Sequence, residues 1–326
     1  MARNALISEK RFNLIEARQG HIRWGAEYQP AMRATRDEAP KISRPSTLYW
    51  AKLGRDLHFM SVAERHVCLL ALYHPRVFDI HEQHALQQFK SPHPLAGHKD
   101  AYGLSLPPLL GTVAVAESLG IISKHPVVYL QDKNSDAESR HAFPYLGDLL
   151  LFLSDEQGPY CVNWNVKACR ENFFDNPRQR RCKAVSTPVD TYTTLSARHR
   201  LEQQYFADAN IPTHFIAAQD LDLSVTHNLN SLCAKAQAPS SLPLEAQEQL
   251  IHIFKDIIGK QTTVLSLLPS LSDRFQCKYD ELLRILYRAI WYRRIRVDLY
   301  RPILPDKPLK AERSDILIDY AHLFGR

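Results

Sequence analysis

Residues 146–167 read LGDLLLFL (Leu146–Leu153), SDEQGP (Ser154–Pro159) and YCVNWNVK (Tyr160–Lys167). Two largely apolar runs on either side of a polar, glycine-containing turn predict an antiparallel β-hairpin. Side chains alternate between the two faces of a strand. One face of the second strand therefore carries Tyr160, Val162, Trp164 and Val166, and the other carries Cys161, Asn163, Asn165 and Lys167. We expect the first face to belong to a core and the second to be available for chemistry.

The hairpin also places a carboxylate near an ammonium group. Asp148 is the only acidic residue in the first strand, and a carboxylate there is costly to bury unless it is paired or binds a metal. Because the strands close at the turn, Asp148 is expected to lie near Asn165 and Lys167. Mg²⁺ prefers oxygen ligands, which could include the main-chain carbonyl of Val166. Glu64, in the first turn of a predicted helix, is a second carboxylate suited to metal-assisted phosphodiester hydrolysis.

Both acidic positions also have ordinary structural interpretations. Ser61 and Glu64 form an S-x-x-E pattern, which is typical of a helix capping box. Asp148 and Lys167 could make a simple cross-strand ion pair. The residues alone leave these interpretations open beside the catalytic one.

The pattern on both sides of the hairpin predicts a mixed chain with a linker at about 234–243, which is rich in Ala, Pro and Ser. Beyond the linker, helices followed by a short β-ribbon suggest a winged helix. The expected domains are a basic N-terminal extension (1–45), a catalytic domain (46–233) and a winged-helix-like domain (243–326). The expected helices are 61–74, 111–120, 195–208, 244–258, 262–275 and 278–292, and the further strands are 77–80, 213–217 and 294–299.

The composition is that of a globular protein with a mild preference for polyanionic partners. The 326 residues are 45% hydrophobic and carry a formal net charge of +6. No stretch approaches the roughly 20 apolar residues of a membrane span, and the N-terminus lacks the apolar core of a signal peptide, so we expect a cytoplasmic protein. The six cysteines contain no C-x-x-C pair, which argues against a zinc ribbon or a redox motif, and are expected to be free thiols. Positive charge is concentrated in residues 1–45, in Arg178–Lys183 and in Arg284, Arg288, Arg293, Arg294 and Arg296.

Five segments, in chain order over roughly 61–232, resemble TnsA-type transposon endonucleases, the endonuclease subunits of heteromeric transposases. Ser61–Gln83 is similar to the family's S-x-x-E helix and D-I-R-E-Q-like strand. Leu146–Leu153 resembles the T-D-F-L strand, and Asn165-Val-Lys167-Ala168 resembles the Q-V-K-P position. The other matches are Thr112–Pro126, similar to I-A-x-x-L-G-I-x-H-P, and Leu201–Phe206 with Ile211–His214, similar to L-E-x-x-Y-W…I-P-W. The departures are Asn165 in place of Gln, His81 in place of Arg, and Lys124 in an enlarged I-x-H-P spacing.

The resemblance implies an α/β chain with a restriction-endonuclease-like domain of the PD-(D/E)xK type. It implies Glu64, Asp148 and Lys167 as catalytic residues, with Glu64, Asp148, the Val166 carbonyl and Asn165 as ligands of Mg²⁺, which Mn²⁺ can replace. Glu202 would be a supporting group or, as we favour from the sequence, a solvated helix residue. The implied activity is cleavage of the 5′, non-transferred strands at transposon ends. The implied partners are DNA, a DDE-type transposase and an AAA+ ATPase regulator that binds the C-terminal domain, with no membrane involved.

Two other functions stay open at this level. One is a non-catalytic DNA-binding or adaptor protein of a mobile element, in which Arg284 and Arg288, one turn apart, would contact phosphates. A salt-sensitive DNA complex without cleavage would indicate this function. The other is a stand-alone restriction or repair nuclease of the same fold, which would cleave at a short site without a partner protein.

Overall fold

The computed structural model describes residues 7–131, 138–175 and 194–326 of a mixed α/β chain. The chain divides into two compact units. Unit 1 comprises Met1–Arg65, Arg76–Asp220 and Gly325–Arg326, and unit 2 comprises His66–Pro75 and Leu221–Phe324. This division differs from the expected domains in two respects. The N-terminal segment belongs to unit 1, and unit 2 begins before the expected linker.

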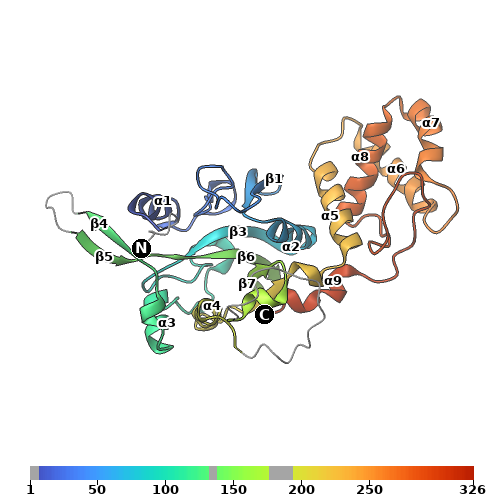
Figure 1. Ribbon diagram of the computed structural model, residues 1–326. Coiled ribbons are helices and arrows are strands. Elements are labelled where there is room, and N and C mark those ends of the chain that lie inside the picture. The colour runs from blue at the N-terminus through green and yellow to red at the C-terminus, as the bar shows by residue number, and fades with distance from the viewer. Residues whose placement is uncertain (1–6, 132–137, 176–193) are drawn as a thin grey trace. The chain divides into compact units, whose positions relative to one another are not determined.

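A four-stranded sheet forms the centre of unit 1 (Figure 1). Its order is β3 (Val77–Leu86), β6 (Tyr145–Asp155), β7 (Gly158–Lys167) and β8 (Thr213–Ala217). The first three strands are antiparallel, and β8 runs parallel to β7. The predicted hairpin is confirmed, with a tighter turn than expected, because Asp155 pairs with Gly158. Gly158 has a φ of +102°, a conformation that glycine adopts without strain.

Helices cover one face of this sheet. The core on that face joins Leu150 and Phe152 of β6 to residues of α3 (Thr112–Ser118) and α4 (Ala197–Ala207). Cys161, Asn163 and Asn165 of β7 are buried, so the strand face expected to be available for chemistry is covered along most of its length. What stays partly open is the end of β7 at Lys167, whose side chain is 25% exposed.

The N-terminal segment runs along the outer edge of β3. It includes α1 (Glu9–Gln19), and the segment after it makes a series of hydrogen bonds to β3. Gly25 N–H donates to Asp79 Oδ2 (2.7 Å), the Tyr28 hydroxyl to Glu82 O (2.8 Å), Ala31 N–H to Gln83 O (2.9 Å), and Ala85 N–H to Gln19 Oε1 (3.0 Å). The expected basic extension is therefore an integral part of unit 1.

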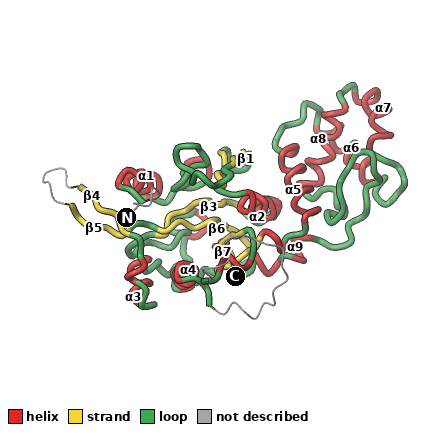
Figure 2. Tube along the Cα trace, in the orientation of Figure 1, coloured by secondary structure: helices red, strands yellow, loops and turns green. Residues whose placement is uncertain are grey.

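Two smaller hairpins and one helix complete the regular structure of unit 1 (Figure 2). The first hairpin pairs β1 (Ser46–Trp50) with β2 (Arg55–Phe59), and the second pairs β4 (Val127–Gln131) with β5 (Glu138–Ala142). Helix α2 (Val62–Tyr73) begins in unit 1, and its later turns belong to unit 2. The expected helices 61–74, 111–120 and 195–208 correspond to α2, α3 and α4, and the strand 77–80 extends to Leu86.

Unit 2 is mostly helical. Helices α5 (Leu223–Ala236), α6 (Leu244–Asp256) and α7 (Val264–Phe275) pack on α8 (Tyr279–Trp291), and a short α9 spans Ile316–Asp319. The expected strand 294–299 is wrong, because this segment holds only the bridge Val297–Ala311. The Asn228 side chain binds Leu299 O at the end of this segment, and also Arg301 O and Ile303 N just after it, so these backbone groups are satisfied without a sheet.

Two expectations from composition have different outcomes. Cys169 is disulfide-bonded, so the expectation of six free thiols is wrong. Cys68, Cys161, Cys233 and Cys277 form no disulfide, and Cys182 lies outside the described residues. Within the described parts of the chain, no helix is both long and apolar enough to cross a membrane.

Candidate active site

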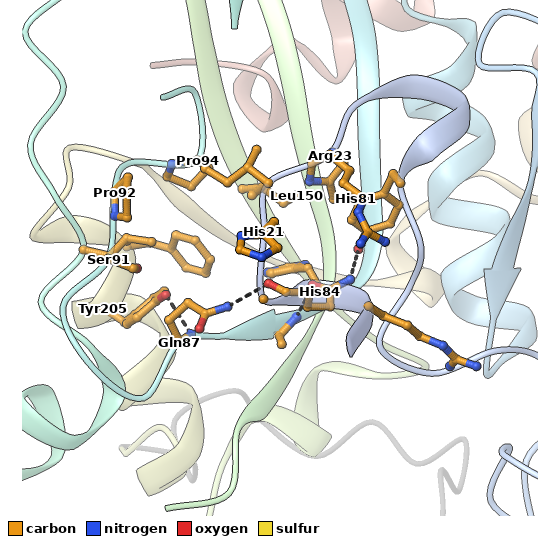
Figure 3. A pocket seen from close by; sticks show the side chains of 18 residues that line it. His21, Arg23, His81, His84, Gln87, Ser91, Pro92, Pro94, Leu150 and Tyr205 are labelled. Atoms are coloured by element: carbon orange, nitrogen blue, oxygen red, sulfur yellow. Dashed lines mark hydrogen bonds between the residues drawn. The ribbon is translucent and has the colours of Figure 1, made fainter. Parts of the chain in front are cut away.

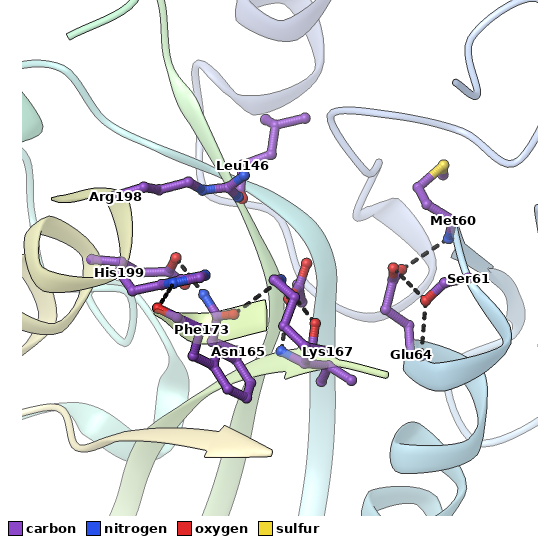
Figure 4. Close-up of polar contacts among 12 residues, drawn as sticks. Met60, Ser61, Glu64, Leu146, Asn165, Lys167, Phe173, Arg198 and His199 are labelled. Atoms are coloured by element: carbon purple, nitrogen blue, oxygen red, sulfur yellow. Dashed lines mark hydrogen bonds and ion pairs between the residues drawn. The ribbon is translucent and has the colours of Figure 1, made fainter. Parts of the chain in front are cut away.

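The end of the β6–β7 hairpin brings together the predicted Asp148, Asn165, Val166 and Lys167. Asp148 Oδ2 accepts hydrogen bonds from Val166 N–H (2.7 Å) and from Lys167 Nζ (3.1 Å). Lys167 Nζ also donates to Asn165 Oδ1 (3.1 Å) and to Val166 O (2.8 Å). A carboxylate, an amide and a main-chain carbonyl thus converge on one positive charge (Figure 4). The expected proximity is confirmed, and so is the cross-strand ion pair.

The electrostatics of this junction keep Asp148 ionised. Burial by itself raises the pKa of Asp148, but the charges of Lys167 and Arg198 and the hydrogen bond from Val166 outweigh it. The pKa of Asp148 therefore lies below its usual value. An ionised carboxylate that is partly open to solvent is available to bind a cation.

Glu64 makes the contacts of a helix cap, and its carboxylate also reaches the central sheet. It donates its N–H to Ser61 Oγ (3.2 Å), and its carboxylate accepts from the Ser61 hydroxyl and from Met60 N–H (both 2.8 Å), which are contacts typical of a capping box. The same carboxylate accepts from Gln83 Nε2 at 2.8 Å. Burial, together with the negative charge of Asp148, raises the pKa of Glu64 to about 7. The two acids are therefore close enough to interact electrostatically.

Glu202 is buried, so the interpretation as a solvated helix residue is wrong. It is 1% exposed because it lies on the face of α4 that also carries Tyr205 and Phe206, three and four residues later. Its carboxylate accepts from Asn163 Nδ2 (3.1 Å) and from Asn165 Nδ2 (2.7 Å). Because the Asn165 amide donates to Glu202, its oxygen is left to face Lys167. Burial raises the pKa of Glu202, although the charge of Arg198 opposes the shift.

Arg198 is a candidate residue that the sequence analysis missed. It lies in the first turn of α4 and is exposed, and its Nη2 donates to Leu146 O at 2.5 Å. Its charge contributes to lowering the pKa of Asp148. Figure 4 shows its guanidinium beside Leu146. The signal in the sequence was its place one helical turn before Glu202, just before the matched segment Leu201–Phe206.

The donor set tests whether a metal fits. Among the described residues, no group of three or more His, Cys, Asp or Glu side chains is arranged to hold a metal ion. The convergence around Lys167 uses one carboxylate, one amide and one carbonyl oxygen. Such a hard, mixed oxygen set suits Mg²⁺, which usually keeps several of its waters. Of the four predicted ligands, Glu64 fits least directly, because both its oxygens already accept hydrogen bonds.

A separate cavity of about 170 Å³ lies in unit 1 (Figure 3). Its lining includes His81, His84, Leu150 and Tyr205. Burial lowers the pKa of His84 to about 4, although the charge of Asp148 opposes the shift, so this imidazole is neutral near pH 7. A Cβ added to Gly147 would lie 2.3 Å from the His84 ring, so this packing requires glycine next to Asp148. The cavity supports the site's backbone and offers no carboxylate to a cation.

The arginines of the C-terminal basic cluster, which include Arg284 and Arg288, have partners within unit 2. Residues 178–183 lie outside the described range. Arg284 pairs with Asp280 and Glu281, Arg293 with Asp315, Arg294 with Glu248, and Arg296 with Glu312 and Asp315. Arg288 donates to Ala238 O. These contacts weaken the case for a phosphate-binding face on α8.

Neither a family model nor a curated protein sequence matches this chain. The chemistry of the Asp148 site is therefore what indicates a function for this chain.

Proposed function

We propose that this chain is a metal-dependent DNA endonuclease whose active site contains Asp148, Glu64 and Lys167. The observation that carries the proposal is the convergence of three oxygens, from Asp148, Asn165 and Val166, on one cationic position at the end of β7. The interacting carboxylate of Glu64 supports it. A paired strand, a helix-borne glutamate and a lysine on the neighbouring strand also agree with the restriction-endonuclease-like fold that we propose for unit 1.

The predicted ligands would hold Mg²⁺ or Mn²⁺ through the oxygens of Asp148, Asn165 and Val166, with Glu64 beside them. When bound, such an ion supplies a Lewis acid that activates water and stabilises negative charge on a phosphate. Lys167 would then exchange its three oxygen acceptors for the phosphate or the attacking water. Glu64, with a pKa of about 7, can take up or release a proton near neutral pH.

The charges of the site suit an anionic substrate once a divalent ion is present. Asp148 and Glu202 bring two carboxylates, and Lys167 and Arg198 bring two positive charges. Without a metal, the site has little charge to attract a phosphodiester. A bound divalent ion gives it a net positive charge, and the exposed Arg198 can then contact the DNA backbone.

The TnsA-like pattern of segments refines the proposal. The substrate would be the 5′, non-transferred strands at transposon ends. A DDE-type transposase would cut the other strands, and an AAA+ ATPase would bind unit 2, which we propose is winged-helix-like. We propose a cytoplasmic location. The adaptor alternative has less support, because the arginines it requires on α8 already have intramolecular partners.

A crystal of the full chain soaked in Mn²⁺ tests the metal site without any partner. We expect an anomalous peak within coordination distance of Asp148 and displacement of the Lys167 ammonium. Cleavage of DNA carrying transposon ends, alone and with a DDE-type transposase, then tests the activity. A peak absent from Asp148 together with stable, salt-sensitive DNA binding and no cleavage would favour the adaptor instead. Cleavage at a short site without any partner would indicate a stand-alone nuclease.

A further inference from the structure

Gln83 has an unusual backbone conformation in the middle of β3. Its φ is +47°, in the left-handed region that favours glycine. The neighbouring pairs Glu82–Leu149 and His84–Gly147 keep the same register, so the strand continues across this residue. A non-glycine residue in this region costs on the order of 1 kcal/mol and persists only where its surroundings hold it. Strand pairing does not require this conformation, so its role lies elsewhere.

The left-handed residue changes which way the side chains of β3 project. In a regular strand, consecutive side chains point to opposite faces. Here Glu82 binds Arg55 (2.8 Å), and the next residue, Gln83, binds Glu64 (2.8 Å). Both partners belong to the single segment 55–64. The positive φ at Gln83 therefore turns its amide toward the segment that Glu82 already contacts.

Three groups donate hydrogen bonds to the Glu64 carboxylate, and one of them comes from a distant part of the sequence. Met60 N–H and the Ser61 hydroxyl belong to the start of α2, so they move with Glu64. Gln83 comes from the central sheet, 19 residues along the chain, and β3 is hydrogen-bonded to β6, the strand that carries Asp148. Its amide is the contact that ties Glu64 to the strands of the site. Gln83 is 4% exposed, and its carbonyl accepts from Ala31 N–H.

We propose that Gln83 is a positioning residue for Glu64. Its left-handed backbone, held by the N-terminal segment at Ala31, directs the amide onto the Glu64 carboxylate and fixes that carboxylate relative to Asp148. This inference rests on the proposed metal-dependent nuclease and adds a residue that acts through Glu64 without touching metal or DNA.

The substitution Gln83→Gly separates positioning from folding. Glycine adopts a positive φ freely, and this relief of strain offsets part of the stability lost with the buried side chain, so we expect the variant to fold with a melting temperature close to that of the wild type. The amide donor is lost, so we expect Mn²⁺ affinity and single-turnover cleavage each to fall by about 10- to 100-fold, as for other groups that orient a ligand. Gln83→Asn is the second variant. Asparagine tolerates the left-handed region but is one methylene shorter, so it should fold normally and show the same losses.

Asn210→Gly is the matched control. Asn210 also has a positive φ (58°) but is exposed in the turn after α4, so its replacement should change neither Mn²⁺ affinity nor cleavage. The inference would be overturned if both Gln83 variants kept wild-type Mn²⁺ affinity and cleavage.

A crystal structure of metal-free Gln83→Gly gives a readout independent of activity. We expect the Glu64 carboxylate to rotate, and an unchanged carboxylate would overturn the inference whether or not the wild-type chain cuts DNA. Wild-type protein that neither binds Mn²⁺ nor cleaves would instead refute the proposed function.

Discussion

The two units of this chain differ in where they keep their acidic side chains. In unit 1, Glu82 and Glu202 are almost completely buried, and Glu64 is 7% exposed. In unit 2, several acids pair with arginines, and the pair of Glu248 with Arg294 is well exposed to solvent. Its buried acids also have simple roles, since Glu281 accepts from Ser240 and Ser241 near a helix start.

The difference matters because a buried carboxylate loses its hydration at a cost in free energy, whereas a carboxylate in a surface ion pair stays hydrated. Within unit 1, Glu82 is paired with Arg55, whereas Asp148 and Glu202 belong to a set of groups that fix one another's orientation. We infer that replacing an acid of the Asp148 site in unit 1 should change activity more than stability. Replacing a member of a surface ion pair in unit 2 should change neither strongly.

The largest effect is expected for Asp148→Ala. This variant removes the carboxylate around which the proposed cation site is built, so cleavage should fall by about a thousandfold or more. Single-turnover assays in Mg²⁺ and Mn²⁺ measure the change. Asp155→Ala is the control, because Asp155 lies at the other end of β6 and pairs with Arg326. Equal activity of the Asp148 variant and the control would contradict the nuclease proposal.

Glu202→Gln should lower cleavage by roughly 10- to 100-fold. Asn163 and Asn165 donate to different oxygens of the Glu202 carboxylate, and the glutamine would replace one of these acceptors with an NH2 donor, so one of the two hydrogen bonds is lost and the amide orientation of Asn165 is no longer fixed. The melting temperature should stay the same or rise, because a buried charge is removed. Activity and thermal unfolding are measured on the same samples. Lower stability with unchanged cleavage would show that Glu202 serves only the core.

The ionisation of Glu64 should make the stability of the folded protein depend on pH. Its pKa in the folded protein, about 7, exceeds the usual 4.5, so the folded state binds the proton more tightly than the unfolded state. This contribution is fully present below about pH 4.5 and is lost as the pH rises to 7. Glu64→Gln mimics the protonated form. As the pH rises from 4.5 to 7, the unfolding free energy of the wild type should therefore fall by about 1 to 3 kcal/mol relative to that of Glu64→Gln. A difference that is constant with pH would contradict the raised pKa.

The smallest effect is expected for Glu248→Gln in unit 2. The partners Glu248 and Arg294 are both well exposed, and pairs of this kind contribute little to stability. The melting temperature should stay within about 1 °C of wild type, and cleavage should not change. Differential scanning calorimetry and the same cleavage assay test both statements. A large loss of activity would mean that this surface of unit 2 contributes to DNA or partner binding.

The sequence predicted those parts of the fold that depend on local periodicity. The hairpin 146–167 was recoverable because apolar strands flank a polar turn, and the positions of Asp148, Asn165 and Lys167 followed from its geometry. The strand expected at 294–299 does not form, because this segment makes only the bridge Val297–Ala311, and Leu299 O at its end accepts from the distant side chain of Asn228.

The parts of the site that were missed depend on contacts across the chain. The residues next to Gln83 in the sequence do not predict a positive φ, because the contact at this position is a hydrogen bond from the distant Ala31 N–H to Gln83 O. The burial of Glu202 could have been inferred, since a helix places it on the same face as Tyr205 and Phe206. The roles of Gln83 and Glu202 became visible only with their partners in place.

The N-terminal segment along β3 has a consequence for the chain as a folding unit. β3 is an edge strand of ten residues, and most of its side chains are buried. Residues 19–31 bind three of its backbone groups, Glu82 O, Gln83 O and Ala85 N–H. If these residues were removed, that stretch of β3 would become a free edge at which a second molecule could add a strand. The segment that looked like a basic arm therefore covers a sheet edge.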